Sequence, residues 1–136
     1  MSESPIGRLL RAVDTLDADA VIRISSPECR LLTADGQRAG GAQAMRAVLE
    51  RYFVRLHSAS HRVTAEWHVD DVWIAEIDAV YELAEGVRLG PLPRAFIVRV
   101  DGEQLIDVRV YGAHERPLDD PGNPQMSAGG RWPPAL

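Results

Sequence analysis

The stretch Val72-Trp73-Ile74-Ala75-Glu76-Ile77-Asp78-Ala79-Val80-Tyr81-Glu82-Leu83 is typical of a β-strand, because its residues sort into two different faces with period two. One face is wholly apolar or aromatic and carries Trp73, Ala75, Ile77, Ala79, Tyr81 and Leu83. The other mixes carboxylates with branched aliphatics and carries Val72, Ile74, Glu76, Asp78, Val80 and Glu82. A face in open water would hold few Val and Ile, so we expect both faces to contact protein. We interpret the mixed face as the wall of a pocket.

Three helices and a small hairpin are predicted before this strand. The first helix opens at Ser4-Pro5, and the second begins at Asp17 and stops before Pro27. A hairpin is expected around the turn 34–36. The third helix follows, with one apolar face that runs at spacings of three and four and comprises Met45, Val48, Leu49, Tyr52, Phe53 and Leu56.

Four strands are predicted in the second half of the chain, at 61–69, 72–84, 93–100 and 104–113. Short turns join most of them, so they form an antiparallel meander that the helices must cover on one face. The predicted class is α+β, with three N-terminal helices packed on a curved, mainly antiparallel sheet. We expect one domain over 1–116 and an extended tail, rich in Pro and Gly, over 117–136.

Composition excludes several classes of function. The net charge is −5 and the arginines are scattered, which disfavours nucleic acid as a partner. No apolar run approaches the 18 or so residues of a membrane span, and the first residues lack the pattern of a secretory signal. The chain has a single cysteine, Cys29, so a reducing cytoplasm is expected. All 15 basic residues are arginine, which indicates a GC-rich bacterial genome.

The order of these elements resembles the nuclear transport factor 2-like (NTF2-like) superfamily, particularly its SnoaL-like branch. The resemblance covers about residues 5–115 and rests on Val13 to Val21, the glycine before the third helix, Val72 to Leu83, and Ile106 to Tyr111. It implies a cone-shaped fold whose sheet and helices enclose a pocket. It also implies a homodimer through the outer face of the sheet, to which we assign Trp73, Ile77, Tyr81 and Leu83.

Two activities of that superfamily do not fit this sequence. The oxyanion hole and base of ketosteroid isomerases would fall on Leu9, Phe96 and Thr33, none of which can do that chemistry. The aspartate–arginine–aspartate set of the epoxide hydrolases is matched only at Asp78. Glu76 stands in place of its arginine, and Val110 in place of its second aspartate.

The mixed strand face therefore supplies the predicted site. Asp78 is the candidate general base, because a carboxylate in an apolar cavity becomes more basic and needs neither metal nor cofactor. His114 is a second catalytic candidate, at the end of the last strand. The predicted ligand contacts are Glu76, Arg94, Tyr52, Phe96 and Val110. No metal site is expected, since the four histidines lack zinc-ligand spacing.

Three classes of function remain open. The first is an isomerase, dehydratase or cyclase that transfers protons without a cofactor. The second is a protein that binds a small apolar or polycyclic organic molecule without turnover, and the third is a dimerising interaction module. Contact between Arg94 and Asp78 would favour binding, because the cation would keep the carboxylate ionised.

Overall fold

The computed structural model describes residues 3–112 and confirms the α+β class. The elements in chain order are α1 (Pro5–Asp14), α2 (Ala18–Arg23), β1 (Ser25–Leu32), β2 (Arg38–Gly40), α3 (Ala42–Phe53), β3 (Leu56–Val69), β4 (Val72–Leu83), β5 (Arg88–Asp101) and β6 (Gln104–Tyr111). The predicted division into a domain over 1–116 and a tail over 117–136 stays a prediction, because the tail lies outside the described residues.

The first two helices begin where their capping residues predict. The Ser4 hydroxyl accepts a hydrogen bond of 3.0 Å from the backbone N–H of Gly7, and Pro5 occupies the first turn of α1. At α2, the Asp17 carboxylate accepts a bond of 2.9 Å from the N–H of Asp19. Each side chain satisfies a backbone donor that the helix itself leaves without a partner.

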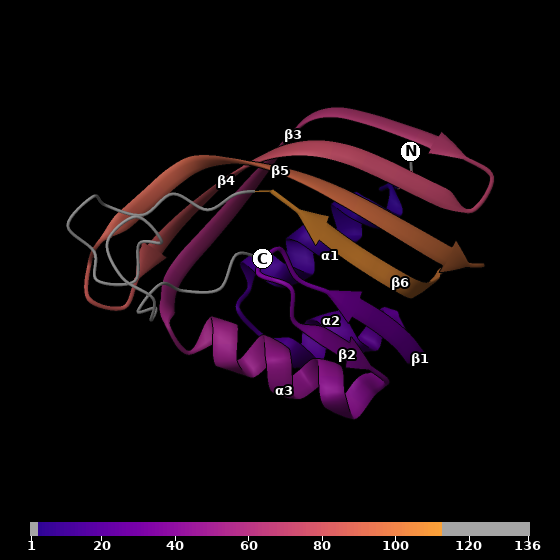
Figure 1. Cartoon of the computed structure of the whole chain (residues 1–136), viewed down its shortest axis with the longest axis horizontal. Helices are drawn as coiled ribbons and strands as arrows, with labels where there is room; N and C mark the ends of the chain where they lie inside the picture. Colours follow the sequence, from indigo (N-terminus) through magenta and orange to yellow (C-terminus); the bar gives the residue numbers. More distant parts are fainter. Residues whose placement is uncertain (1–2, 113–136) are drawn as a thin grey trace.

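All six strands form one sheet in the order β2-β1-β6-β5-β4-β3. The meander from β3 to β6 is antiparallel, as predicted, and β1 joins it by pairing parallel to β6. Figure 1 shows the strongly curved sheet arching over the helices, which all lie on its concave side. No helix in the described part of the chain is long and apolar enough to cross a membrane.

Several predicted boundaries differ from the structure, including the strand starts predicted at 61 and 93, which lie at Leu56 and Arg88. The third helix ends at Phe53, and Leu56 instead begins β3, where it pairs with Leu83 of β4. Strand β1 begins at Ser25 and runs through Pro27, which has no N–H to give to a ladder. The register between β1 and β6 shifts between Ser25 and Arg30, and this irregularity accommodates the proline.

Strand β4 has the opposite orientation to the one predicted. Ala75, Ile77 and Tyr81 are each 2% exposed or less and pack in the core on the concave side. Trp73 and Leu83 pack against the same core. The predicted dimer contact through Trp73, Ile77, Tyr81 and Leu83 is therefore wrong, since helices and neighbouring strands already cover that face. The wholly apolar face faces the core because its burial removes the most apolar area from water.

Candidate functional site

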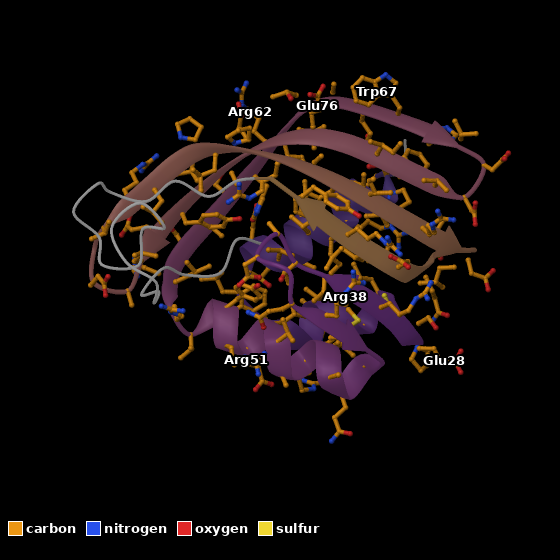
Figure 2. All side chains as sticks on the ribbon, in the orientation of Figure 1. Glu28, Arg38, Arg51, Arg62, Trp67 and Glu76 are labelled. Carbon is orange, nitrogen blue, oxygen red and sulfur yellow. The ribbon has the colours of Figure 1, made fainter. Side chains whose placement is uncertain are left out.

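Asp78 and Glu76 lie on the convex side of the sheet and do not line a concave pocket. The Asp78 carboxylate pairs with Arg62 of β3 at 2.9 Å, and Arg62 and Asp78 are register partners. Figure 2 shows Arg62, Glu76 and Trp67 along the top of the arch, directed away from the helices. The predicted placement of Asp78 as a pocket base and of Glu76 as a ligand contact is thus corrected. His114 lies outside the described residues.

Four of the predicted contact residues do lie on the concave side. Tyr52, Phe96 and Val110 are each 1% exposed, and Arg94 is 3% exposed. They come from α3, β5 and β6, so the fold brings together residues that the sequence separates. Arg94 and Asp78 are on opposite faces of the sheet, because Arg94 is the register partner of Ile77. The contact between Arg94 and Asp78 that would have favoured a binding protein therefore does not form. The ligand-binding role of these four residues stays a prediction.

A line of polar side chains crosses the middle of the concave face. The His61 ring of β3 contacts the Asp14 carboxylate at the end of α1, with 2.6 Å between Nδ1 and Oδ1. Its other nitrogen, Nε2, lies 3.3 Å from the Tyr81 hydroxyl of β4. Tyr81 in turn interacts with the guanidinium of Arg94 on β5. Four elements thus place a carboxylate, an imidazole, a phenol and a guanidinium next to one another in a row.

The surroundings of His61 are mostly apolar and aromatic. Its side chain has no exposed surface, whereas that of Asp14 is 32% exposed. The ring lies edge-on to Tyr81 and Phe96, with centroid distances of 5.6 and 6.0 Å. In the tautomer in which Asp14 accepts from Nδ1–H, Nε2 is an acceptor toward the Tyr81 hydroxyl. Asp14 therefore links a buried acid–base group to solvent.

Arg94 is the buried cation at the end of this line. Burial lowers the pKa of its guanidinium from the ordinary value, and its interaction with Tyr81 acts in the opposite direction. The guanidinium also donates a hydrogen bond of 3.1 Å to the carbonyl of Pro93. A guanidinium held at this position would favour negative charge on a neighbouring phenol or ligand oxygen.

Sequence reasoning missed Asp14, His61 and Tyr81 as a group. Asp14 and His61 are 47 residues apart, and no spacing rule joins a helix end to a strand at that distance. The alternation along 72–83 predicts Tyr81 on the outer face of the sheet, whereas the structure places it in the core. The one available signal was the alternation along β3, which places His61 on the same face as Ala59.

Within residues 3–112, a small apolar cavity lies between the helices and the sheet. Its volume is about 10 Å³, and it is lined by Leu9, Val13, Val21, Leu31, Met45, Leu49, Phe96, Val108 and Val110. That volume is about what one water molecule needs, and an apolar lining offers it no hydrogen bonds. An organic ligand can enter this space only if the lining side chains move apart.

Tyr52 belongs to a second polar group, at the turn between β1 and β2. Its hydroxyl donates a hydrogen bond of 2.6 Å to Asp35, which also accepts from Thr33 and Gln37. Burial raises the pKa of the Asp35 carboxyl, but these hydrogen bonds outweigh it and leave the pKa below the ordinary value. Burial and the hydrogen bond to Asp35 both raise the pKa of Tyr52. This group closes the turn onto α3 and holds Asp35 ionised, which makes it a poor base.

The described residues supply neither an activated thiol nor a metal site. Cys29 is fully buried, and burial raises the pKa of its thiol to about 11, so it is not an activated nucleophile. Within residues 3–112, no three side chains of His, Cys, Asp or Glu gather in a way that could hold a metal ion.

Comparison with known proteins finds similar folds among solved structures. No family model matches the chain, and no curated protein matches it. Among solved structures, a protein from Catenulispora acidiphila with a ketosteroid isomerase-like fold, in complex with trimethylamine, is similar with a TM-score of 0.75. The two are 13% identical, over 83% of this chain and 88% of that one.

Two further structures carry enzyme descriptions. An epoxide hydrolase-like protein of M. tuberculosis has a TM-score of 0.69 and 15% identity, over 80% of each chain. A protein from Jannaschia described as a SnoaL-like polyketide cyclase has a TM-score of 0.67 and 13% identity, over 82% of this chain and 90% of that one. The chain therefore has the NTF2-like fold that its sequence resembles, including the form seen in SnoaL-like proteins. At these identities, the likeness shows the fold alone.

Proposed function

We propose that this chain is a small-molecule pocket protein that transfers protons from the concave face of its sheet, as an isomerase, dehydratase or cyclase without a cofactor. The observation that supports this is the 2.6 Å contact between His61 and Asp14 beneath an apolar interior. His61 takes the role of general base that the sequence suggested for Asp78. Asp14 orients the ring and stabilises the imidazolium that forms when Nε2 accepts a proton.

The lining of the interior favours a small apolar ligand with one polar group. Phe96 and Val110 offer apolar contact, while the guanidinium of Arg94 offers donors to a ligand oxygen that gains negative charge. A polycyclic molecule would need a pocket of about 300 Å³ or more. The cavity of about 10 Å³ would have to open widely for it, so a one- or two-ring ligand fits this proposal better.

Replacing His61 by Gln is expected to slow proton transfer strongly and leave the fold intact. The probe is 2-tetralone, an apolar two-ring ketone, and the measurement is deuterium uptake next to its carbonyl in heavy water. A positioned general base contributes about 10²–10⁴-fold, so the rate should fall by that factor. Asp14→Asn should also slow uptake, because the amide cannot stabilise an imidazolium.

The matched control is His57→Gln on the same strand. The His57 side chain is 70% exposed and 3.9 Å from Glu82, so its replacement should not change the rate. Uptake by the parent protein no faster than by His61→Gln would contradict the proposed turnover. Saturable binding of 2-tetralone without uptake would then favour a binding protein.

A dimerising module is the second candidate, and the convex face favours it. Trp67, Val69 and Ile74 are 53%, 71% and 37% exposed, and they lie together on β3 and β4. Exposed apolar groups clustered on one sheet face are typical of an interface. We propose that the chain is a homodimer through this face, and that it works in the cytoplasm, where the buried thiol of Cys29 stays reduced.

Ile74→Arg is expected to convert the dimer to a monomer. The change places a long cation at the centre of the apolar cluster, where a second copy would leave it without water or partner. Sedimentation equilibrium at tens of micromolar gives the mass directly. Val54→Arg is the control, because Val54 is 77% exposed at the end of α3 and away from the convex face. A parent protein that sediments as a monomer would rule out the dimer.

A further inference from the structure

The convex face has a polar hollow at the edge of the sheet opposite β3. It measures about 240 Å³ and lies over β1, β2 and β6. Three arginines and one aspartate line it together with Gly40; the full lining is Arg30, Leu31, Leu32, Arg38, Ala39, Gly40, Asp107 and Arg109. In Figure 2, Arg38 is seen at β2, well apart from Arg62 and Trp67 at the top of the arch.

Strand register explains why these side chains converge. Arg30 stands beside Gly40 of β2 on one side and beside Asp107 of β6 on the other. One row further, Leu32 lies between Arg38 and Arg109. Residues at matching positions of paired strands point to the same face, so Arg30, Arg38 and Arg109 share one face of the sheet with Gly40 and Asp107. Gly40 leaves its part of the hollow open, because a Cβ there would meet no atom within 4 Å.

A buried carboxylate holds two of the arginines in place. Asp107 is 4% exposed, and its two oxygens accept from different arginines. Arg30 Nη2 lies 2.9 Å from one oxygen, and Arg109 Nε lies 3.2 Å from the other. Each guanidinium has five N–H donors, so each retains donors for a further acceptor. The arginines are thereby ordered before any ligand arrives, which lowers the entropic cost of binding.

The charges in the hollow do not balance. Asp107 neutralises one of the three arginines, which leaves two positive charges. Arg38 is exposed and, within residues 3–112, forms no ion pair with a carboxylate. The protein as a whole has a net charge of −5, so this concentration of cations is local and runs against the overall charge.

We propose that this hollow binds a small dianionic oxyanion, such as the phosphate group of a phosphomonoester or a short dicarboxylate. Planar guanidinium groups match the oxygens of both anions with paired hydrogen bonds. Two net positive charges correspond to one dianion. The hollow lies on the opposite face of the sheet from His61, so the proposal stands independently of the proton-transfer function.

Gly40 gives a sharp test. A Cβ placed on Gly40 meets no atom within 4 Å, so a small side chain fits there without strain. Gly40→Ala should bind inorganic phosphate like the parent protein. Gly40→Asp puts a tethered carboxylate among the arginines, and phosphate binding should be lost. Arg38→Gln should weaken binding about ten-fold, and Arg88→Gln, which removes the same charge at an exposed position of β5, should leave it unchanged.

The measurement is titration with inorganic phosphate and, separately, with succinate, followed by amide chemical shifts at constant ionic strength. Saturable shifts at residues 30, 38–40 and 107–109 with either anion support the site. The anion that binds more tightly shows whether the site takes a phosphate group or a dicarboxylate. Shifts spread over many arginines, or equal in Gly40→Asp and the parent protein, would overturn it. Dissociation of a dimer by phosphate would also overturn the proposal. It would show that the hollow holds a carboxylate of the second copy, which phosphate displaces.

Discussion

Ile77→Asp is expected to prevent the chain from folding, whereas Asp78→Asn, one residue away, should hardly change its stability. Ile77 is 1% exposed within the core on the concave side. The substitution removes apolar contacts worth about 2–5 kcal/mol and also buries a carboxylate without a partner. Together these costs approach the whole stability of a domain, about 5–15 kcal/mol. Circular dichroism and urea unfolding measure both variants.

The control removes only a partly exposed ion pair. Asp78 contacts Arg62, whose side chain is 75% exposed, and such pairs contribute about 0.2–1 kcal/mol. The two substitutions thus test the orientation of β4 directly. If Asp78→Asn destabilised the protein more than Ile77→Asp, then Asp78 would face the core and the orientation described above would be wrong.

Local signals predicted most of the fold. The Ser4 and Asp17 caps, the apolar spacing of α3 and the alternation along β4 each depend on a few neighbouring residues. Such signals fix the type of an element and often its start. They also fixed the order of the elements, and with it the resemblance to the NTF2-like superfamily.

The orientation of β4 depended on more than the strand itself. Both of its faces contain apolar residues, and the expectation of a pocket led us to place Glu76 and Asp78 inside. The burial of the other face is favoured more strongly, because the side chains of Ala75, Ile77 and Ala79 contain no polar atom. Glu76 is exposed, and Asp78 has an oppositely charged partner on the adjacent strand, so neither needs the interior.

The candidate site could not have been assembled from sequence. His61 and Tyr81 meet because β3 and β4 pair in a register that places His61 opposite Ala79, two residues from Tyr81 on the same face. Asp14 reaches His61 because the curved sheet wraps over the end of α1. The arginine hollow has the same origin, since it requires the parallel pairing of β1 with β6. Long-range pairing of this kind leaves no local periodicity to detect.

Phe96→Ala is expected to lower the free energy of unfolding by about 3–5 kcal/mol. Phe96 is 1% exposed, lies edge-on to the His61 ring and lines the small interior cavity. Its loss removes aromatic contacts and leaves a larger apolar space that the neighbouring strands can close only in part. A decrease in melting temperature of more than about 10 °C should follow for a domain of this size.

The same variant tests whether the interior can hold a ligand. An apolar cavity left by a large side chain stays dry and binds benzene, so saturating benzene should recover part of the lost melting temperature in Phe96→Ala. Tyr111→Ala on β6 is the control, because Tyr111 is 41% exposed and its truncation opens no interior space. Recovery by benzene would show that an aromatic ring can reach the site of Phe96 beside His61, as the proposed substrate must. A smaller loss of stability without recovery by benzene would show that neighbouring elements collapse into the space, and a ligand would then have no route to His61 by this path.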